Sequence, residues 1–388
     1  MQTAFVWDDA LASYRFTATH PMNPRRLQLT LELIRRLGLI EADQVVAPRR
    51  ASDDELLLAH APELVDAVRR ASAGEVFPGA ARFGLGTDDV PIVEGMHDAA
   101  AHIVGATLTA AELVMSGRAK RAFNISGGLH HARRAESAGF CVYNDLAVAI
   151  RWMQKQHGAR VLYIDYDAHH GDGVQWIFYD DPDALTLSFH ESGAFLFPGT
   201  GFVEETGAGD GVGYSVNMPL DAHTEDDSFE AVFRALVPDV VKAYEPDVIV
   251  LQCGCDAHVL DPLTHLRCTT GLFERMTRLV CDVADEHCEG RVVATGGGGY
   301  AIYKVVPRAW TLVWAALNGI DAPDVIPDDY LRMLRLECGE LVPSTLRDAP
   351  DAFLPSDRRA AATETNTRTL GSVRRAVLPL LTGWGLGF

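Results

Sequence analysis

The stretch VLYIDYDAHHGDG, residues 161–173, changes character after its first four residues. Residues 161–164 are apolar, which is typical of a buried strand. The nine residues that follow carry three carboxylates and two imidazoles, with no lysine, glutamate or serine among them. Carboxylates and imidazoles are the side chains that bind metal ions and transfer protons. The stretch therefore predicts a buried strand that ends in a chemically active loop.

Other predicted strands end in the same way. Four more short aliphatic runs predict strands, at residues 121–125, 185–189, 247–252 and 291–295. Segments of helical length separate them, so we predict an α/β fold in which helices cover a mainly parallel sheet. Because the carboxyl ends of parallel strands share one edge of a sheet, the loops after them should line a common pocket. Those loops read SGGLHH (126–131), DYDAHHGD (165–172), HESG (190–193), CGCDAH (253–258) and GGGGY (296–300).

Two predictions concern helices near the N-terminal and C-terminal parts of the chain. A capping box that begins at Ser52 predicts one helix from there to about Arg70. The tail, residues 350–369, is mostly polar and predicts irregular structure on the surface. A short last helix is expected over residues 372–378, with Pro379 ending it because proline cannot continue a helix.

Composition narrows the class of protein. There are 34 basic and 53 acidic residues, and the formal net charge of -19 argues against sequence-independent binding to nucleic acid. The seven cysteines are an odd, unpatterned set that suits a reducing cytoplasm better than a disulfide framework. Neither a signal-peptide pattern nor an apolar run of the roughly 18 residues that span a membrane is present. We therefore expect a cytoplasmic protein that binds neither nucleic acid nor membranes, in an oligomeric state that the sequence leaves open.

The chain contains no internal repeat, no low-complexity tract and no convincing linker. Its 388 residues are 48% hydrophobic, which is enough for one large core. We expect a single domain over residues 1–388, with a core of about 1–320 and a C-terminal extension over 321–388.

Three side chains at two of the predicted strand ends could share a metal ion. Asp167 and His169 are two residues apart, so an extended chain would point both to one side. Asp256, after another strand, could complete the set. Three protein ligands leave positions open for water and substrate, which is the pattern of catalytic metal sites. Two carboxylates and one imidazole suit a divalent metal, and because this oxygen-rich ligation is harder than that of most zinc sites, Fe²⁺ or another first-row ion remains open.

Other strand ends supply groups that could transfer protons near such an ion. His130 and His131 would face it, and an imidazole is a good base when a carboxylate holds its other nitrogen. Asp165 and Asp172 are the natural partners, giving two Asp–His pairs. Tyr300 follows four glycines and could donate a hydrogen bond to the oxyanion of a tetrahedral intermediate.

These motifs, in this order, resemble the zinc-dependent histone deacetylase family. The resemblance is greatest to class I members and to the bacterial acetoin-utilisation-type deacetylases, and it covers roughly residues 1–320. It implies an arginase-like α/β domain and hydrolysis of the N-acetyl amide of a lysine-like chain. The motifs that carry it are SGGLHHA (126–132), GFCVYND (139–145), VLYIDYDAHHGDG (161–173), FPGTG (197–201), GCD (254–256) and GGGGY (296–300).

The resemblance implies catalytic roles for five residues. His131, backed by Asp172, would be the general base and acid. His130, backed by Asp165, would act mainly through its charge. Tyr300 would polarise the acetyl carbonyl.

It also implies ligands for two kinds of metal ion. Zinc, with Fe²⁺ as an alternative, would be held by Asp167, His169 and Asp256. A structural potassium ion would lie beside it, at Asp165, Asp167, His169, Ser188 and Phe189. A second potassium site would involve Phe178 and Tyr214.

The substrate would enter a narrow channel. By the resemblance, Asp89 is the rim carboxylate that holds the substrate backbone, and Arg26 belongs to an internal acetate channel. The residues that would contact the substrate stem and acetyl group are Gly139, Phe140, Phe197 and Gly298.

The chain departs from the eukaryotic class I pattern around this channel. The residues after Asp256 read AHVLDPLTHL (257–266), and His97 and residues 191–196 also differ. The rim therefore predicts no particular substrate. Three classes of substrate remain open: an acetylated lysine protein or peptide, an acetylated polyamine, or another small acetylated amine. Two other functions remain as alternatives: a ureohydrolase with two manganese ions, and a non-catalytic protein that binds acetylated ligands.

Overall fold

The computed structural model describes residues 1–381, and within them eight strands form one sheet. Every neighbouring pair is parallel, in the order β2-β1-β3-β8-β7-β4-β5-β6. The predicted parallel α/β fold is therefore confirmed. The strands are β1 (Thr3–Val6), β2 (Val45–Val46), β3 (Arg121–Asn124), β4 (Val161–Asp165), β5 (Ala184–Glu191), β6 (Ser215–Leu220), β7 (Val248–Gln252) and β8 (Val292–Thr295).

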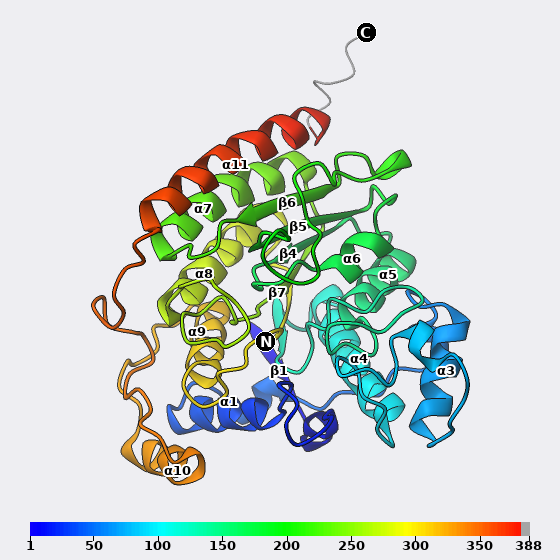
Figure 1. The fold of residues 1–388 in the computed structure, drawn as a ribbon, viewed down its shortest axis with the longest axis horizontal. Helices are drawn as coiled ribbons and strands as arrows, with labels where there is room; N and C mark the ends of the chain where they lie inside the picture. Colours follow the sequence, from blue (N-terminus) through cyan, green and yellow to red (C-terminus); the bar gives the residue numbers. More distant parts are fainter. Residues whose placement is uncertain (382–388) are drawn as a thin grey trace.

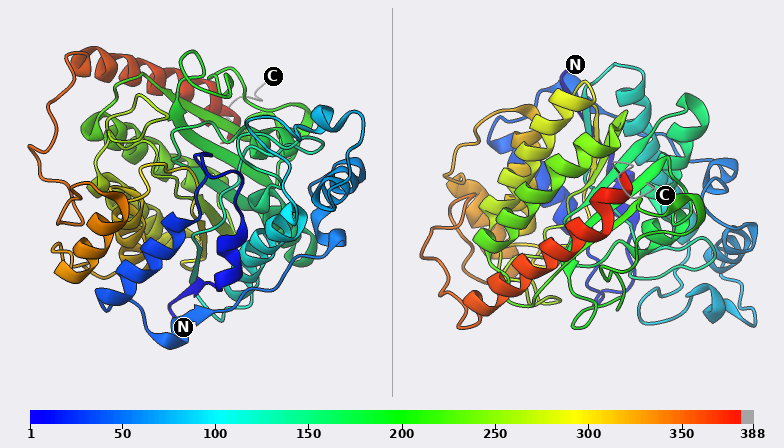
Figure 2. Two further views of the ribbon diagram at one scale, coloured as in Figure 1. Left: turned by 60° about the horizontal axis from the view of Figure 1, so that its bottom comes forward. Right: turned by 90° about the horizontal axis from the view of Figure 1, so that it is seen from above.

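Helices cover both faces of the sheet (Figure 1). Helices α3 to α6 lie on one side, and α1 and α7 to α9 lie on the other, while α11 runs along α7 and the β6 edge (Figure 2). The helices are α1 (Arg25–Arg36), α2 (Asp53–Leu56), α3 (Pro62–Ser72), α4 (Met96–Met115), α5 (Asp145–His157), α6 (Asp172–Ile177), α7 (Asp226–Tyr244), α8 (Thr270–His287), α9 (Val306–Asn318), α10 (Asp328–Cys338) and α11 (Arg359–Leu381).

The five predicted strands correspond to β3, β4, β5, β7 and β8, with ends that differ by at most two residues. They form the centre of the sheet and are buried on both faces, which is why each reads as a continuous apolar run. The strands β1, β2 and β6 were not predicted. Strand β2 has only two residues, and β6 contains Pro219, which weakens a strand pattern.

The single helix predicted from Ser52 to Arg70 is wrong. The capping box is present, because Ser52 and Glu55 bond reciprocally, but α2 ends at Leu56. A second helix, α3, begins at Pro62, since proline has no N–H for the preceding turn and is favoured at the first position of a helix.

The prediction for the tail is wrong in its second half. Helix α11 begins at Arg359, the tenth residue of the segment predicted as irregular. It extends through Pro379 to Leu381, so the prediction of a short helix over 372–378 that ends at Pro379 is also wrong. Its Val373 and Val377 are buried in the main core, so packing against α7 and β6 stabilises a helix that its polar composition does not predict.

The C-terminal extension packs on the rest of the chain at a second site as well. Tyr330 and Leu334 of α10 share a core cluster with Leu29 and Leu33 of α1 and Leu312 of α9. We infer from these contacts that the residues beyond 320 belong to the same domain as the core; residues 382–388 of that extension lie outside the described part. Within residues 1–381, no helix is both long and apolar enough to cross a membrane.

Candidate metal centre and active site

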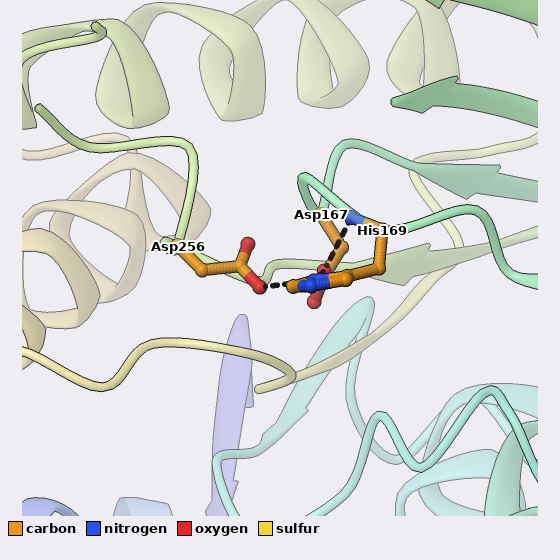
Figure 3. A group of neighbouring side chains, drawn as sticks. All are labelled: Asp167, His169 and Asp256. Carbon is orange, nitrogen blue, oxygen red and sulfur yellow. Dashed lines mark hydrogen bonds and ion pairs between the residues drawn. The ribbon is translucent and has the colours of Figure 1, made fainter. Parts of the chain in front are cut away.

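The strand-end loops meet as predicted at the carboxyl edge of the sheet. Asp167 and His169 lie in the loop after β4, and Asp256 lies in the loop after the neighbouring strand β7. One ligand atom from each of these buried side chains lies within 4.8 Å of the others. Figure 3 shows the three side chains converging from the two loops. Among residues 1–381, this is the one such group of three that could hold a metal ion.

Neighbouring groups hold the three candidate ligands in place. His169 Nδ1 lies 2.8 Å from Asp256 Oδ2 and 3.2 Å from Asp167 Oδ1. Asp167 Oδ2 accepts hydrogen bonds from the Gln252 side chain at 2.8 Å and from the Gly298 backbone at 2.7 Å. These bonds fix which oxygens face the centre of the group, as outer contacts of metal ligands do.

Two glycines make room for the carboxylates. A Cβ atom at Gly254 would lie 2.0 Å from Asp167 Oδ2, and one at Gly298 would lie 2.0 Å from Asp256 Oδ2. Both contacts are far shorter than atoms allow, so any larger residue would displace a candidate ligand. Gly298, predicted to contact substrate, therefore lies directly against the carboxylates.

The charges at this position fit a divalent cation. Burial and the negative charge of Asp167 raise the pKa of Asp256 to about 7. Two carboxylates so close together repel each other, and a cation bound between them removes that repulsion. The separation of the three atoms and their oxygen-rich character fit Zn²⁺ or Fe²⁺.

The two predicted Asp–His pairs are present. His130 Nδ1 lies 2.8 Å from Asp165 Oδ2, and His131 Nδ1 lies 2.8 Å from Asp172 Oδ1. Because each Nδ1 donates its proton to a carboxylate, the Nε2 atoms are left to face each other, 3.0 Å apart. Arg133, which was not predicted, also donates to Asp172, at 2.9 Å.

The two imidazoles differ in protonation. Burial lowers the pKa of His130, but the charges of Asp165 and Asp167 outweigh this effect and raise it to about 9. Burial and the positive charge of His130 lower the pKa of His131 to about 4. These opposite shifts favour a charged His130, whose Nε2–H points at His131, and a neutral His131 whose Nε2 is an acceptor.

Tyr300 lies beside the two carboxylates and keeps its proton. Burial and the charges of Asp256 and Asp167 raise the pKa of the Tyr300 phenol well above its ordinary value. Its backbone N–H donates to Asp261 Oδ2 at 2.8 Å, a contact that was not predicted. The phenol is thus a hydrogen-bond donor on a loop whose backbone is held by a third carboxylate, that of Asp261.

The predicted channel residues surround these groups. The ring centroids of Phe197 and His131 are 5.0 Å apart, and those of Phe140 and Tyr300 are 5.8 Å apart. A Cβ at Gly139 would lie 2.2 Å from the His131 ring, so only glycine fits there. Phe197 is half exposed, which marks the side of the site that faces solvent.

Asp89 and Arg26 each contact a loop of this cluster. The Asp89 carboxylate accepts a hydrogen bond from the Gly139 backbone at 2.6 Å and so holds the loop of Phe140. Arg26 is buried behind Tyr300, where its Nη1 donates to the Gly299 carbonyl at 2.8 Å. The Arg26 Nε has no hydrogen-bond partner within the described residues.

The residues predicted to bind potassium fall into two places. Asp165 and Ser188 are aligned on the paired strands β4 and β5, beside the metal-binding loop, and Ser188 Oγ lies 2.8 Å from His190 Nδ1. Phe178 directly follows α6, and the Tyr214 carbonyl accepts from the Thr186 backbone at 2.9 Å. Phe189, next to Ser188, packs its ring on that of Phe233. The two predicted potassium sites have no residue in common.

Sequence reasoning missed three groups that hold the site: Arg133, Gln252 and Asp261. Gln252 is the last residue of a predicted strand, so its position beside the other strand-end groups was a usable signal. Asp261 lies in the segment that departs from the class I pattern, and no local pattern links it to Tyr300.

Comparisons with known proteins agree with this geometry. Residues 20–317 match the family model described as the histone deacetylase domain. The chain is 46% identical to the acetoin utilization protein AcuC of Bacillus subtilis over 97% of both chains. It is 42% identical to AcuC of Staphylococcus xylosus, over 94% of this chain and 96% of that one.

Solved structures agree as well. The crystal structure of an HDAC homolog from Aquifex aeolicus superposes with a TM-score of 0.85 at 31% identity, over 95% of this chain and 100% of that one. The same values hold for an HDAC homolog complexed with SAHA. The chain therefore belongs to the histone deacetylase family of hydrolases and is similar to its acetoin-utilisation branch.

Proposed function

We propose that this protein is a metal-dependent amide hydrolase that removes acetyl groups from lysine side chains or from a related small acetylated amine. The observation that carries the proposal is the meeting, in one buried place, of a candidate metal triad, a neutral imidazole and a protonated phenol. Together these groups could activate water and stabilise the oxyanion formed when an amide is attacked.

Asp167, His169 and Asp256 would hold the ion, which we expect to be Zn²⁺ or Fe²⁺. A bound divalent ion supplies Lewis-acid polarisation of a carbonyl and lowers the pKa of water. The protein's part is to keep the ligand oxygens oriented, through the Gln252 amide and the Gly298 N–H.

His131 would take the proton of the attacking water at Nε2. Asp172 holds its Nδ1, fixing the tautomer in which Nε2 is an acceptor, and Nε2 would exchange its hydrogen bond from His130 for one from the water. Burial raises the pKa of Asp172, but the hydrogen bonds from His131 and Arg133 outweigh this effect and lower it to about 2, so the carboxylate stays charged. His131 would then give the proton to the leaving amine, while His130 remains a fixed positive charge beside the oxyanion.

Tyr300 would donate its phenolic hydrogen bond to the carbonyl oxygen as that oxygen gains charge. Phe140 and Phe197 would grip the aliphatic stem of the substrate, and Asp89 would hold its backbone at the rim. Arg26, with an unpartnered Nε, would hold the released acetate.

Further assignments belong to the same proposal. Asp165, Asp167, His169, Ser188 and Phe189 would bind a structural potassium ion, and Phe178 and Tyr214 a second one. Seven free cysteines, six of them buried, support a reducing cytoplasmic location. A two-manganese ureohydrolase would need further aspartates that bridge a second ion, and the group among residues 1–381 has only Asp167, His169 and Asp256.

A panel of acetylated substrates tests the proposed reaction. The enzyme, loaded with Zn²⁺ or Fe²⁺, is incubated with acetyl-lysine peptides, acetylated polyamines and arginine, with and without a hydroxamate inhibitor. We expect free acetate from at least one of the acetylated substrates, no urea from arginine, and loss of activity with the hydroxamate. Urea release, or binding of acetylated ligands without any acetate, would support one of the two alternative functions instead.

A further inference from the structure

His258 lies two residues beyond Asp256, in the segment that departs from the class I pattern, and both of its ring nitrogens are engaged. Its Nε2 lies 2.9 Å from Asp348 Oδ2, and its Nδ1 accepts a hydrogen bond from the Leu260 backbone at 3.1 Å. The ring is fully buried and packs edge-on against Phe353 at 5.8 Å. Because Nδ1 is an acceptor, the ring carries its proton on Nε2 and donates it to Asp348.

Asp348 belongs to the C-terminal extension, beyond the residues 20–317 that match the histone deacetylase model. It lies on the segment 339–358 that joins α10 to α11 along the outside of the molecule (orange in Figure 1). The side chain is nevertheless only 4% exposed. Its Oδ1 accepts from Arg308 at 2.8 Å, and its Oδ2 accepts from the Thr270 backbone at 2.9 Å. The carboxylate is thus anchored to α9 and α8 and offers His258 a fixed acceptor.

The loop that His258 holds reaches the active site in two directions. The His258 carbonyl accepts from the Asp261 backbone at 2.8 Å, and the Asp261 carboxylate accepts from the Tyr300 backbone at 2.8 Å. In the other direction, Asp256 is two residues earlier in the same loop, and its carbonyl accepts from the Thr264 hydroxyl at 2.9 Å. One short loop therefore carries a candidate metal ligand and the carboxylate that holds the backbone of Tyr300.

We propose that Asp348 is a positioning residue for the active site, which acts through His258 to hold the 256–261 loop and with it Asp256 and the backbone of Tyr300. The C-terminal extension would then complete the metal centre and would do more than cover the core. The effect on turnover rests on the proposed function, whereas the effect on metal binding does not depend on which reaction the enzyme performs.

Metal affinity separates this role from a purely structural one. Asp348 links the extension to α8 and α9, so its loss will lower the melting temperature under either interpretation. A loop that is merely less stable still binds the ion with unchanged affinity once the protein is folded. A loop that positions Asp256 loses affinity, typically about 10- to 100-fold when an outer contact of a ligand is removed.

The test compares four variants with the wild-type protein by chelator competition for Zn²⁺, well below each melting temperature. Asp348→Asn weakens the contact by removing the charge and one of the two acceptor oxygens, and His258→Phe removes the contact. His258→Gln keeps a donor for Asp348, and Arg347→Gln is the matched control. Arg347 is the neighbour of Asp348 and pairs with Glu274 at 2.8 Å, but has no bond to the 256–261 loop.

We expect Asp348→Asn and His258→Phe to bind Zn²⁺ about 10- to 100-fold more weakly, with a parallel fall in kcat. His258→Gln should recover most of the affinity, and Arg347→Gln should lower only the melting temperature. Should His258→Phe fail to fold, Asp348→Asn, which changes a single side-chain atom, carries the comparison. Wild-type zinc affinity in Asp348→Asn, or an equal loss in Arg347→Gln, would overturn the proposal. Weakened zinc binding in an enzyme without deacetylase activity would refute the proposed reaction and leave the positioning role standing.

Discussion

Replacing His131 with alanine is expected to lower kcat by roughly 100- to 10,000-fold, the usual contribution of a general base and acid. The imidazole is neutral at pH 7, because burial and the charge of His130 lower its pKa to about 4, so it is ready to accept the proton of the attacking water. The Zn²⁺ content of the variant should equal that of the wild type, since His131 is not one of the three candidate ligands. Steady-state kinetics and metal analysis on the same preparation measure both effects.

Two variants control this experiment. His157→Ala removes an exposed imidazole on α5 and should leave kcat unchanged. His130→Ala removes the charged member of the pair and should cost less than His131→Ala, because its role is electrostatic and it transfers no proton. A His131→Ala enzyme with the wild-type rate, or a His130→Ala enzyme that is the slower of the two, would refute the assignment of the base.

Replacing Tyr300 with phenylalanine is expected to lower kcat by roughly 100- to 1000-fold, as loss of one oxyanion donor does in other hydrolases. The phenol is protonated at any working pH, because burial and the nearby carboxylates raise its pKa well above the ordinary value. KM should change far less than kcat, since the hydrogen bond strengthens only as the carbonyl oxygen gains charge.

Tyr303→Phe is the matched control for this change. Tyr303 lies three residues further along the chain, and its hydroxyl lies 3.3 Å from the exposed Glu337 carboxylate. Its substitution should leave both kinetic constants unchanged. A Tyr300→Phe enzyme in which KM rises and kcat does not fall would indicate that the phenol binds the ground state and not the transition state.

The metal triad could be predicted from the sequence because its determinants are local. Asp167 and His169 follow an apolar run at a spacing of two, and β4, β7 and their neighbours are parallel, so their ends had to meet. The same reasoning located both Asp–His pairs.

Other features depend on contacts that no local pattern encodes. His258 and Asp348 are 90 residues apart, and a buried histidine reads in sequence like any other. The position of α11 likewise depends on packing against α7 and β6, which outweighs the polar composition of its segment. The break between α2 and α3, by contrast, could have been predicted from the sequence. Pro62 interrupts the predicted helix, and the effect of a proline on a helix is local.

The central claim is that Asp167, His169 and Asp256 share one divalent ion, and a metal count tests it most directly. Wild-type protein and Asp256→Ala are loaded with Zn²⁺, freed of loosely bound ions and analysed by elemental mass spectrometry, with their folding checked by circular dichroism. We expect about one ion per chain in the wild type and almost none in a folded Asp256→Ala, since two of the three ligands hold the ion poorly. Two ions per chain in the wild type, or an unchanged count in the variant, would contradict the account.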